Sequence, residues 1–548
     1  MERGLSWVRG ATEPPLLDIT IGHALDLAAE RWGERDALIS VAQSVRWSWS
    51  EFSDRVNTLA GGLLSLGLVP GDRLAIWAPN CAEWALLQFA TAKVGVILTT
   101  VNPAFREAEL EFVLNKVEAK AIVAANSFKT SDYVAMVERI DTPFLQNRIK
   151  IGGERREGWL EFDQLSHAPS DAHASKLLKI GARIEPGDAI NIQFTSGTTG
   201  QPKGATLSHR NILNNGYFVG LAQELTADDR ICVPVPLYHC FGMVMANLAA
   251  VTCGAAIVYP GAGFDPEETL RAIERERCTA LYGVPTMFIA QLNHPAFEQF
   301  ALSSLRTGII AGSPCPIEVM RQLVSRMHLA GITIAYGMTE TSPVSFQSSL
   351  NDPLEARVTT IGRVQPHLEV KVIDDTGKVT PPGVPGELCT RGYSVMLGYW
   401  DEPERTAEAV DPDGWMHTGD VGTIEDDGYG NIVGRIKDMV IRGGENIYPR
   451  EIEEFLYTHP KIADVQVVGV PSRRMGEELC AWIIPTPGES CDEQDVRDFC
   501  REKIAHFKVP RYIRFVDSFP LTVSGKVQKY LIRDRMIQEL NLAMEPTA

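Results

Sequence analysis

Strand-like and helix-like patterns alternate through the first part of the chain. Short apolar runs typical of buried strands occur at residues 73–77, 96–100 and 121–124. Residues 81–93 and 107–116, which lie between these runs, have the length and periodicity of helices. Asn80 can cap the first helix. Strands joined through helices form right-handed crossovers, so the pattern predicts a parallel, doubly wound sheet covered by helices.

The alternation returns later and then gives way to a β-rich pattern. Further strand-like runs occur at residues 189–194, 306–311 and 331–335. From Val370 onward, turn signals at residues 374–377 and 426–428 separate short strand-like runs. Residues 128–173 are more polar and less periodic, and we interpret them as a variable excursion from the sheet.

The end of the chain has the pattern of a separate unit. Strand-like runs occur at residues 465–470, 479–484 and 512–516, and helix-like runs at residues 449–459 and 493–505. This order predicts a small α+β domain. The chain as a whole is therefore predicted to be an α/β protein: a large N-terminal domain with doubly wound sheets and a β-rich subdomain, then a small α+β C-terminal domain.

Composition narrows the class of protein. A length of 548 residues is too great for one ordinary domain, and 45% hydrophobic with 22% charged residues is typical of a globular protein. The net charge of −18 argues against binding to nucleic acid or to an anionic membrane. Ten cysteines without CxxC or Cys/His spacing indicate reduced thiols and no metal cage.

Two segments bear on the location of the protein. The first ten residues lack the apolar region of a secretory signal, so we expect a cytoplasmic protein. Residues 231–264 contain no Asp, Glu, Lys or Arg, but prolines and glycines interrupt them, so we expect no transmembrane segment. A buried helix at residues 243–251 and a strand at residues 255–259 are the better interpretation.

A loop rich in hydroxyl groups follows the strand at residues 189–194. It has the sequence TSGTTGQPKG, and its candidate ligand residues are Thr195, Ser196, Gly197, Thr198, Thr199, Gly200 and Lys203. Hydroxyls, backbone N–H groups freed by glycine and one lysine suit phosphate oxygens. The order differs from a Walker A loop, which places lysine directly after the second glycine. The alternative is a flexible surface turn.

An aromatic and imidazole cluster lies at residues 236–242, with the sequence PLYHCFG. Tyr238, His239 and Phe241 suit the mouth of a pocket for an organic acid. The alternative for His239 is a hydrogen-bonded residue of the core.

Two further strands end in polar or glycine-containing loops. The first ends at Gly312, Ser313 and Pro314, and the second at Tyr336, Gly337, Met338, Thr339 and Glu340. Ligands of parallel sheets bind beyond the carboxyl ends of the strands, so these loops could converge with the Thr195 loop. Glu340 would offer an oxygen ligand to Mg²⁺, and Tyr336 a flat face to a base. Alternatively, Tyr336 is a core residue and Glu340 a solvated acid.

Two more polar residues stand out near the end of the chain. Asp420 lies in the run GWMHTGD and can accept both hydroxyls of a ribose. Lys526 lies on a glycine-containing tip in the run PLTVSGKV. The alternative for Lys526 is an ordinary surface lysine.

These motifs, taken in order, resemble those of adenylate-forming enzymes, the superfamily of acyl-CoA synthetases, luciferases and peptide-synthetase adenylation domains. The likeness covers about Ser50 to Arg533. It is similar in detail to medium-chain acyl-CoA ligases in three runs, PLYHCFG, IAGSP at residues 310–314 and IRGGENIYP at residues 441–449.

The resemblance implies a site for ATP and Mg²⁺. Thr195, Ser196, Thr198 and Lys203 would hold the β- and γ-phosphates, Thr339 the α-phosphate and Glu340 the Mg²⁺. Tyr336 and residues 312–314 would sandwich the adenine, and Asp420 with Arg435 would bind the ribose.

The resemblance also implies a mobile second domain. Residues 1–436 would form the domain that holds ATP and the acyl pocket, gated by Tyr238 and His239. Residues 437–548 would rotate about a hinge at Lys437. Lys526 would act in adenylation, and Gly443, Gly444 and Glu445 would then form a face for coenzyme A.

The implied activity is an ATP-dependent ligation of a carboxylic acid, most closely a medium-chain fatty acid, to coenzyme A, with AMP and pyrophosphate as products. Three alternatives stay open: an aryl-CoA ligase, an adenylation enzyme that delivers to a carrier protein, and a module that senses AMP without turnover. The sequence leaves the oligomeric state open.

Overall fold

The computed structural model describes residues 4–165, 171–195, 202–313, 317–443, 445–501, 503–522 and 525–542. The chain forms two compact units. The large unit comprises Val8–Val370 with Thr390–His417, and the small unit comprises Met1–Trp7, Lys371–Cys389 and Thr418–Ala548. The chain passes between the units within strands, so each unit is assembled from several segments.

The first sheet of the large unit has eight strands in the order β10-β9-β6-β4-β5-β11-β12-β22. Their bounds are β4 Arg73–Trp77, β5 Ile97–Thr100, β6 Ala121–Ala125, β9 Asn147–Ile151, β10 Leu160–Glu161, β11 Ala189–Thr195, β12 Lys203–Ser208 and β22 Gly398–Tyr399. The strands from β10 to β11 run parallel, and β12 runs antiparallel to both of its neighbours. The sequence predicted β4, β5, β6 and β11 because both faces of these strands are buried and the runs are therefore continuously apolar.

The second sheet has nine strands in the order β19-β18-β17-β16-β15-β13-β14-β2-β3. Their bounds are β2 Asp36–Ser40, β3 Val45–Ser48, β13 Arg230–Cys232, β14 Ala256–Tyr259, β15 Ala280–Gly283, β16 Thr307–Ala311, β17 Gly331–Gly337, β18 Val344–Gln347 and β19 Arg363–Val364. The strands from β17 to β2 run parallel, and antiparallel strands close both edges. The predicted doubly wound architecture is confirmed.

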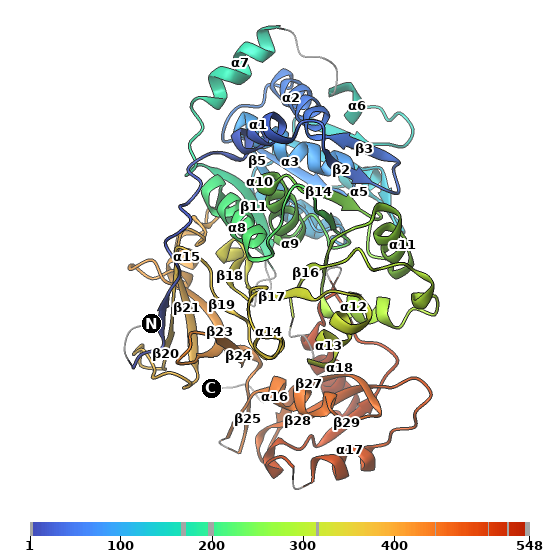
Figure 1. Ribbon diagram of the computed structural model, residues 1–548, viewed down its shortest axis with the longest axis vertical. Helices are drawn as coiled ribbons and strands as arrows, with labels where there is room; N and C mark the ends of the chain where they lie inside the picture. Colours follow the sequence, from blue (N-terminus) through green and yellow to red (C-terminus); the bar gives the residue numbers. More distant parts are fainter. Residues whose placement is uncertain are drawn as a thin grey trace. The chain divides into compact units, whose positions relative to one another are not determined.

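Helices cover these sheets (Figure 1). They are α1 Ile21–Trp32, α2 Trp49–Ser65, α3 Ala82–Val94, α4 Glu107–Lys116, α5 Tyr133–Arg139, α6 Phe162–Leu165, α7 Asp171–Gly181, α8 His209–Ala222, α9 Cys240–Gly242, α10 Ala249–Cys253, α11 Pro266–Glu276, α12 Pro285–Leu292, α13 Ile317–Arg326, α14 Leu354–Thr359 and α15 Pro403–Ala409. Trp49, Phe52 and Phe89 bury their rings where α2 packs against α3. Aromatic rings bury large apolar areas, so this contact is a main source of stability.

The small unit has its own core. Its sheet has the order β26-β25-β28-β27 with β29 beside β28, and its bounds are β25 Val440–Arg442, β26 Glu445–Ile447, β27 Ile462–Ser472, β28 Gly476–Pro485 and β29 Tyr512–Phe515. Helices α16 Pro449–Tyr457, α17 Glu493–Cys500 and α18 Lys529–Glu539 accompany it. Val465, Val467 and Ile483 are buried in this core. The predicted α+β pattern is confirmed.

A further sheet, in the order β1-β20-β21-β23-β24, corresponds to the predicted β-rich region. Its bounds are β1 Trp7–Arg9, β20 Leu368–Ile373, β21 Gly386–Gly392, β23 Met416–Ile424 and β24 Gly430–Arg435.

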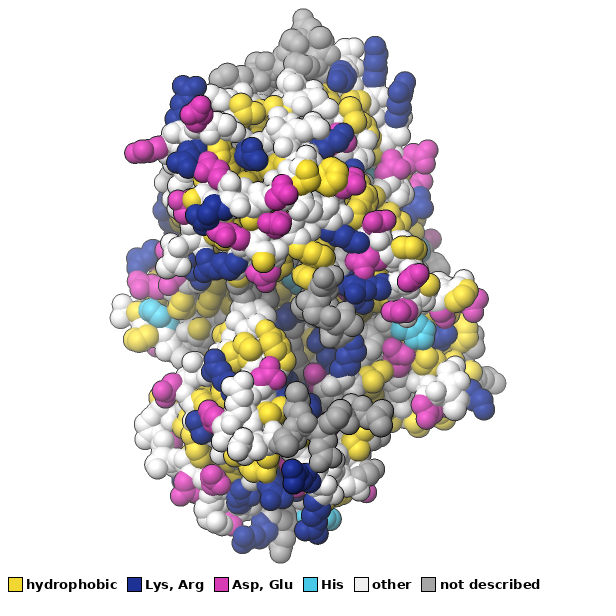
Figure 2. Space-filling view, turned by 180° about the vertical axis from the view of Figure 1, so that it is seen from behind, with side chains coloured by type: hydrophobic (Ala, Val, Ile, Leu, Met, Phe, Trp, Pro, Cys, Tyr) yellow, Lys and Arg dark blue, Asp and Glu magenta, His cyan; other side chains and the backbone are white. Residues whose placement is uncertain are grey.

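On the face drawn in Figure 2, basic and acidic side chains are interspersed among the residues coloured by type. In the described part of the chain, no helix combines the length and apolar composition needed to cross a membrane.

Two local predictions were wrong. Cys81, not Asn80, stands at the N-terminus of α3, and the Asn80 amide instead bonds to the carbonyl of Val235 and the N–H of Leu237, at 2.9 Å each. Residues 128–173 contain two strands of the eight-stranded sheet, β9 and β10, and the polar residues within β9, NRIKI, hid it. The predicted buried helix at residues 243–251 is confirmed, although its first part, Met243–Leu248, is a π-helix that continues as α10.

A buried histidine at the start of α8 makes stability sensitive to acid. The Nδ1 atom of His209 accepts a hydrogen bond from the N–H of Ile21 at 3.2 Å, and its Nε2 has no partner among the described residues. Burial lowers the pKa of His209 to about 4, below the 6.5 of a free histidine. Between these two values the unfolded chain binds the extra proton, so the folded state loses stability as the pH falls from 6.5 toward 4.

We expect His209→Gln to remove part of this acid sensitivity, because the amide can still accept from Ile21 and does not titrate. Urea unfolding gives the free energy of unfolding at pH 7.5 and at pH 4.5. The decrease in this free energy between the two pH values should be larger in the wild type than in the variant, by up to about 3 kcal/mol. His23→Gln, at an exposed position of α1, is the matched control. An equal pH dependence in all three proteins would contradict the prediction.

Candidate functional site

The base of the predicted phosphate loop is a strand pair. Thr195, the last residue of β11, lies directly opposite Lys203, the first residue of β12. The Thr195 hydroxyl oxygen also lies 3.5 Å from the carbonyl oxygen of Lys203. Ser196, Gly197, Thr198, Thr199 and Gly200 lie outside the described residues. Both ends of the loop are therefore fixed by the sheet.

Glu340 lies buried beside this base. It belongs to a single 3-10 turn, Thr339–Thr341, directly after β17, and is 6% exposed. Its Oε1 atom accepts from the Thr195 hydroxyl at 3.3 Å and from the Tyr399 hydroxyl at 2.9 Å. Thr195 and Glu340 come from different sheets, so this contact joins the two.

The Glu340 carboxylate forms no ion pair with any described residue. A buried carboxylate is costly unless a cation or strong donors compensate its charge. Here two hydroxyls approach one oxygen, which orients the carboxylate but leaves the charge itself unmatched. The donor set is that of an oxygen ligand for a divalent cation such as Mg²⁺.

Tyr399 is a site residue that the sequence analysis missed. It lies on β22, which pairs with β12, and its ring carries the Lys203 ammonium 4.8 Å from the ring centroid. Burial, and then the charge of Glu340, raises the pKa of Tyr399, so the hydroxyl stays protonated and donates. Tyr399 thus contacts both charged groups at the loop. It lies 59 residues from Glu340 in the chain, and no local pattern marks it.

The ends of β16 and β17 lie side by side. Ala311 pairs with Ala335, so Gly312 and Ser313 lie next to Tyr336 at the carboxyl edge of the sheet. Gly312 has φ of 91°, which favours glycine. At Gly337 a Cβ atom would lie 1.7 Å from the carbonyl oxygen of Pro343, so no other residue fits there. Pro314 lies outside the described residues.

The aromatic cluster follows β13 in the large unit. His239 caps the short helix α9 through its Nδ1 atom, which accepts from the N–H of Phe241 at 3.4 Å. The Tyr238 ring meets the His239 ring edge to face, with centroids 6.3 Å apart. Phe241 stacks on the buried ring of Tyr282 at 6.0 Å. Tyr238 and His239 are half-buried, whereas the neighbouring side chains of Phe241, Met243 and Tyr282 are buried and form what we call the apolar wall.

One polar side chain connects this wall to the phosphate loop. Gln193 lies on β11, two residues before Thr195, and its Oε1 atom accepts from the N–H of Cys240 at 3.1 Å. Its amide nitrogen donates to the Met243 sulfur at 3.0 Å. Burial raises the pKa of the Cys240 thiol, which therefore stays neutral. The same strand thus positions the start of the loop and the aromatic cluster.

The other predicted residues belong to the small unit. Arg435 on β24 donates to Asp420 on β23, with 3.1 Å between Nε and Oδ1. Lys437 is exposed on a 3-10 turn between β24 and β25.

Gly443 has φ of 61° in the turn before Glu445, and Gly444 lies outside the described residues. Lys526 closes a tight turn, in which its N–H donates to the Thr522 hydroxyl at 3.0 Å and its carbonyl accepts from the Thr522 N–H at 2.7 Å. The turn fixes the backbone that carries the lysine.

Two family models match this chain. The AMP-binding enzyme model covers residues 25–400, and the AMP-binding enzyme C-terminal domain model covers residues 451–526. The chain belongs to the AMP-binding enzyme family. The family predicted from the motifs is therefore confirmed.

Named relatives are similar over almost the whole chain. "Medium-chain acyl-CoA ligase ACSF2, mitochondrial" of Danio rerio is 45% identical over 98% of this chain and 91% of its own length. "Putative acyl-CoA synthetase YngI" of Bacillus subtilis (strain 168) is 44% identical over 96% of this chain and 99% of its own length.

Solved structures agree on the fold. The anthranilate CoA ligase AuaEII in complex with anthranoyl-AMP has a TM-score of 0.86 at 25% identity, over 97% of this chain and 99% of its own. ATP-bound MatB from Rhodopseudomonas palustris has a TM-score of 0.80 at 28% identity, over 94% of this chain and 99% of its own.

Proposed function

We propose that this AMP-binding enzyme is an ATP-dependent acyl-CoA ligase whose substrate is a medium-chain fatty acid. The near full-length likeness to a medium-chain acyl-CoA ligase carries this proposal. In the first step an oxygen of the substrate carboxylate bonds to the α-phosphorus of ATP as pyrophosphate leaves. In the second, the thiol of coenzyme A attacks the acyl carbon of the adenylate, and AMP leaves as the thioester forms.

The phosphate groups of ATP bind at the Thr195 loop. Thr195, Ser196, Thr198 and Lys203 hold the β- and γ-phosphates, and Thr339 holds the α-phosphate. Glu340 would hold Mg²⁺, and the ion would supply positive charge that offsets the phosphate charge as the substrate carboxylate approaches. Tyr399 positions both Glu340 and Lys203, through its hydroxyl and its ring respectively.

Different residues are proposed for the adenine and for the ribose. The adenine lies against Tyr336 and the backbone at Gly312 and Ser313, where glycine at the strand end permits close approach. Asp420 accepts the two ribose hydroxyls. Arg435 orients that carboxylate through the 3.1 Å hydrogen bond.

The second step requires a rearrangement about Lys437. We take residues 1–436 and 437–548 as the two bodies that move, because an exposed single turn at Lys437 can absorb a change in backbone angles. Lys526 stabilises the charge that develops during adenylation and then withdraws. The Gly443–Glu445 turn replaces it, and glycine leaves room for the arm of coenzyme A.

The acyl chain passes Tyr238 and His239 and packs against the apolar wall. Tyr282, Met243, Val284 and Met287 are buried there and carry no charge. A substrate with a second charged group would be buried without a partner and rejected. An aryl-CoA ligase and an enzyme that delivers to a carrier protein are the alternatives that the substrate tests below distinguish.

A cytoplasmic location is part of the proposal. It is supported by nine free cysteines in the described part of the chain, seven of them buried, as expected in a reducing compartment. Because the vertebrate relatives are named mitochondrial, fractionation of cells that express the protein is the direct test.

Tyr399→Phe removes the hydroxyl that holds Glu340 but keeps the ring under Lys203. A hydrogen bond to a charged group contributes about 1.5–3 kcal/mol, so adenylation should slow by about tenfold or more. The Mg²⁺ concentration for half-maximal activity should rise as well. Tyr133→Phe removes another buried hydroxyl of the large unit, bonded to the Pro103 carbonyl at 2.6 Å, and is the control. An unchanged Mg²⁺ dependence in Tyr399→Phe would refute the positioning role.

Lys526→Ala should slow adenylation by about 10²–10³-fold, the scale for the loss of one preorganised electrostatic contact. Pyrophosphate exchange measures this step. Thioester formation from supplied acyl-adenylate should change much less. Lys529→Ala, which breaks a 2.7 Å ion pair with Glu453 in the same unit, is the control. Equal losses in both half-reactions would indicate a structural role for Lys526.

Specificity should follow chain length. Each methylene that enters the apolar wall contributes about 0.8 kcal/mol, or roughly fourfold in kcat/KM, until the pocket is full. For saturated acids from about two to sixteen carbons, kcat/KM should rise steeply, peak in the middle of the series and fall. A maximum with acetate, palmitate or an aromatic acid would exclude the medium-chain assignment. Transfer to a carrier protein but not to coenzyme A would exclude the ligase.

A further inference from the structure

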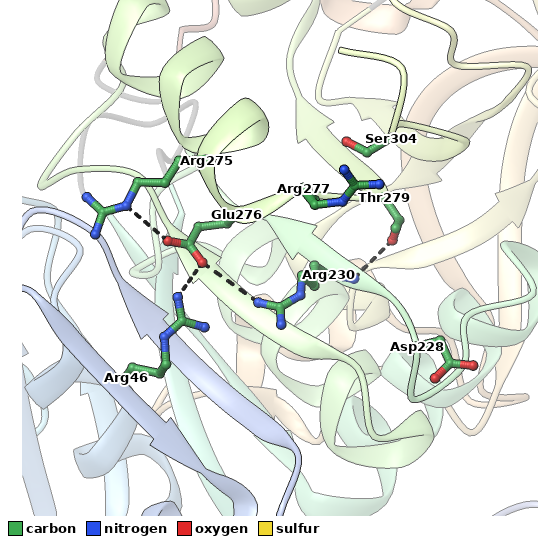
Figure 3. A pocket seen from close by; sticks show the side chains of 8 residues that line it. All are labelled: Arg46, Asp228, Arg230, Arg275, Glu276, Arg277, Thr279 and Ser304. Carbon is green, nitrogen blue, oxygen red and sulfur yellow. Dashed lines mark hydrogen bonds and ion pairs between the residues drawn. The ribbon is translucent and has the colours of Figure 1, made fainter. Parts of the chain in front are cut away.

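A polar pocket lies in the large unit, away from the candidate site. It has a volume of about 460 Å³, within the range of cavities that bind small molecules. Figure 3 shows four arginines around it: Arg46, Arg230, Arg275 and Arg277. They come from β3, the start of β13 and the end of α11, so the fold rather than one sequence run gathers them.

A buried carboxylate organises three of these arginines. Glu276, with a side chain 5% exposed, pairs with Arg46, with Arg275 at 3.3 Å and with Arg230 at 3.8 Å. Each guanidinium has five N–H donors, so these contacts leave donors over for a ligand. The guanidinium groups are held in place before any ligand arrives.

The charges around the pocket do not balance. Asp36 pairs with Arg46 and Arg230 at 2.7 and 2.8 Å, and Asp228 pairs with Arg35 at 2.6 Å. The lining itself holds four arginines and two carboxylates, Asp228 and Glu276, and the partners Arg35 and Asp36 add one charge of each sign. Within the described residues, the Arg277 guanidinium makes no ion pair. The pocket therefore carries an excess of two positive charges in a protein whose net charge is −18.

The pocket lies at the opposite edge of the sheet from the candidate site. Arg230 begins β13, Thr279 directly precedes β15 and Ser304 lies shortly before β16. The pocket therefore lies at the amino ends of these strands. Gly312 and Tyr336 lie at the carboxyl ends of β16 and β17. A strand of five residues such as β16 spans about 17 Å. A ligand here would not occupy the ATP site.

Arg277 has an unfavourable backbone conformation. Its φ is 52°, at the left-handed residue that ends α11, where glycine is preferred. A non-glycine residue there is retained at a cost in stability, and such cost is often connected with function. Ten described non-glycine residues have a positive φ, so the position of its guanidinium at the pocket, and not φ alone, distinguishes Arg277.

We propose that this pocket binds a small phosphorylated organic molecule with at least two negative charges. Guanidinium groups recognise phosphate oxygens through paired N–H donors. The Ser304 hydroxyl already donates to the Cys278 carbonyl at 2.8 Å, so toward a ligand it can only accept, as from a sugar hydroxyl. The excess charge matches that of a phosphate ester.

The test is calorimetric titration at low ionic strength, with fructose 1,6-bisphosphate as the probe and inorganic phosphate as a second probe. We expect the wild type to bind the bisphosphate more tightly than phosphate. Arg277→Gly should weaken binding about tenfold, and Arg277→Glu should abolish it. Arg155→Glu makes the same change in net charge at an exposed arginine that has no ion pair among the described residues. It should bind within about twofold of the wild type.

A thermal melt separates binding from a structural role. If Arg277 serves only to complement the carbonyls at the end of α11, Arg277→Gly should lower the melting temperature and leave bisphosphate binding unchanged. That result would overturn the proposal, as would wild-type binding equal to that of Arg277→Glu or absent altogether. An unchanged or raised melting temperature with lost binding supports it. None of these measurements depends on turnover.

Discussion

The contact of Glu340 with Thr195 and Tyr399 is the interaction on which the proposed chemistry depends. Glu340 follows a strand of the nine-stranded sheet, and its two partners belong to the eight-stranded sheet. The carboxylate therefore has a defined position only where both sheets are correctly packed. Because burial makes an unmatched carboxylate costly, binding of the proposed Mg²⁺ at Glu340 would raise the free energy of unfolding.

Much of the fold could be predicted from the sequence, for a physical reason. Strands such as β4 and β6 are buried on both faces, so their runs are apolar without interruption and depend little on distant residues. Asn80 was misinterpreted because the same side chain can cap a helix or hold a distant loop. Only the tertiary structure decides that it bonds to the segment at Val235–Leu237.

The candidate site likewise contains residues that the sequence identified and residues that it did not. The motifs alone identified Thr195, Tyr336 and Glu340 as candidate site residues, because each lies in a run with a specific order of residues. Tyr399 carries no such mark, since its importance comes from the pairing of β22 with β12. The arginine pocket was also invisible in the sequence, because its charges are spread from Arg46 to Arg277 and the net charge of the chain points the other way.

The position of Gln193 on β11 has a consequence for how specificity can change. Alternate residues of a strand face the same side, so Gln193 and Thr195 are offset by one fixed repeat of about 6.6 Å. One strand thus fixes the distance between the proposed nucleotide site and the apolar wall of the proposed acyl pocket. A shift of this strand would move Gln193 and Thr195 together. The substrate carboxylate would then no longer be aligned with the rest of the proposed site. Variation in substrate length should therefore accumulate on the opposite wall, at β15 and α12, where a side chain can change size without altering that spacing.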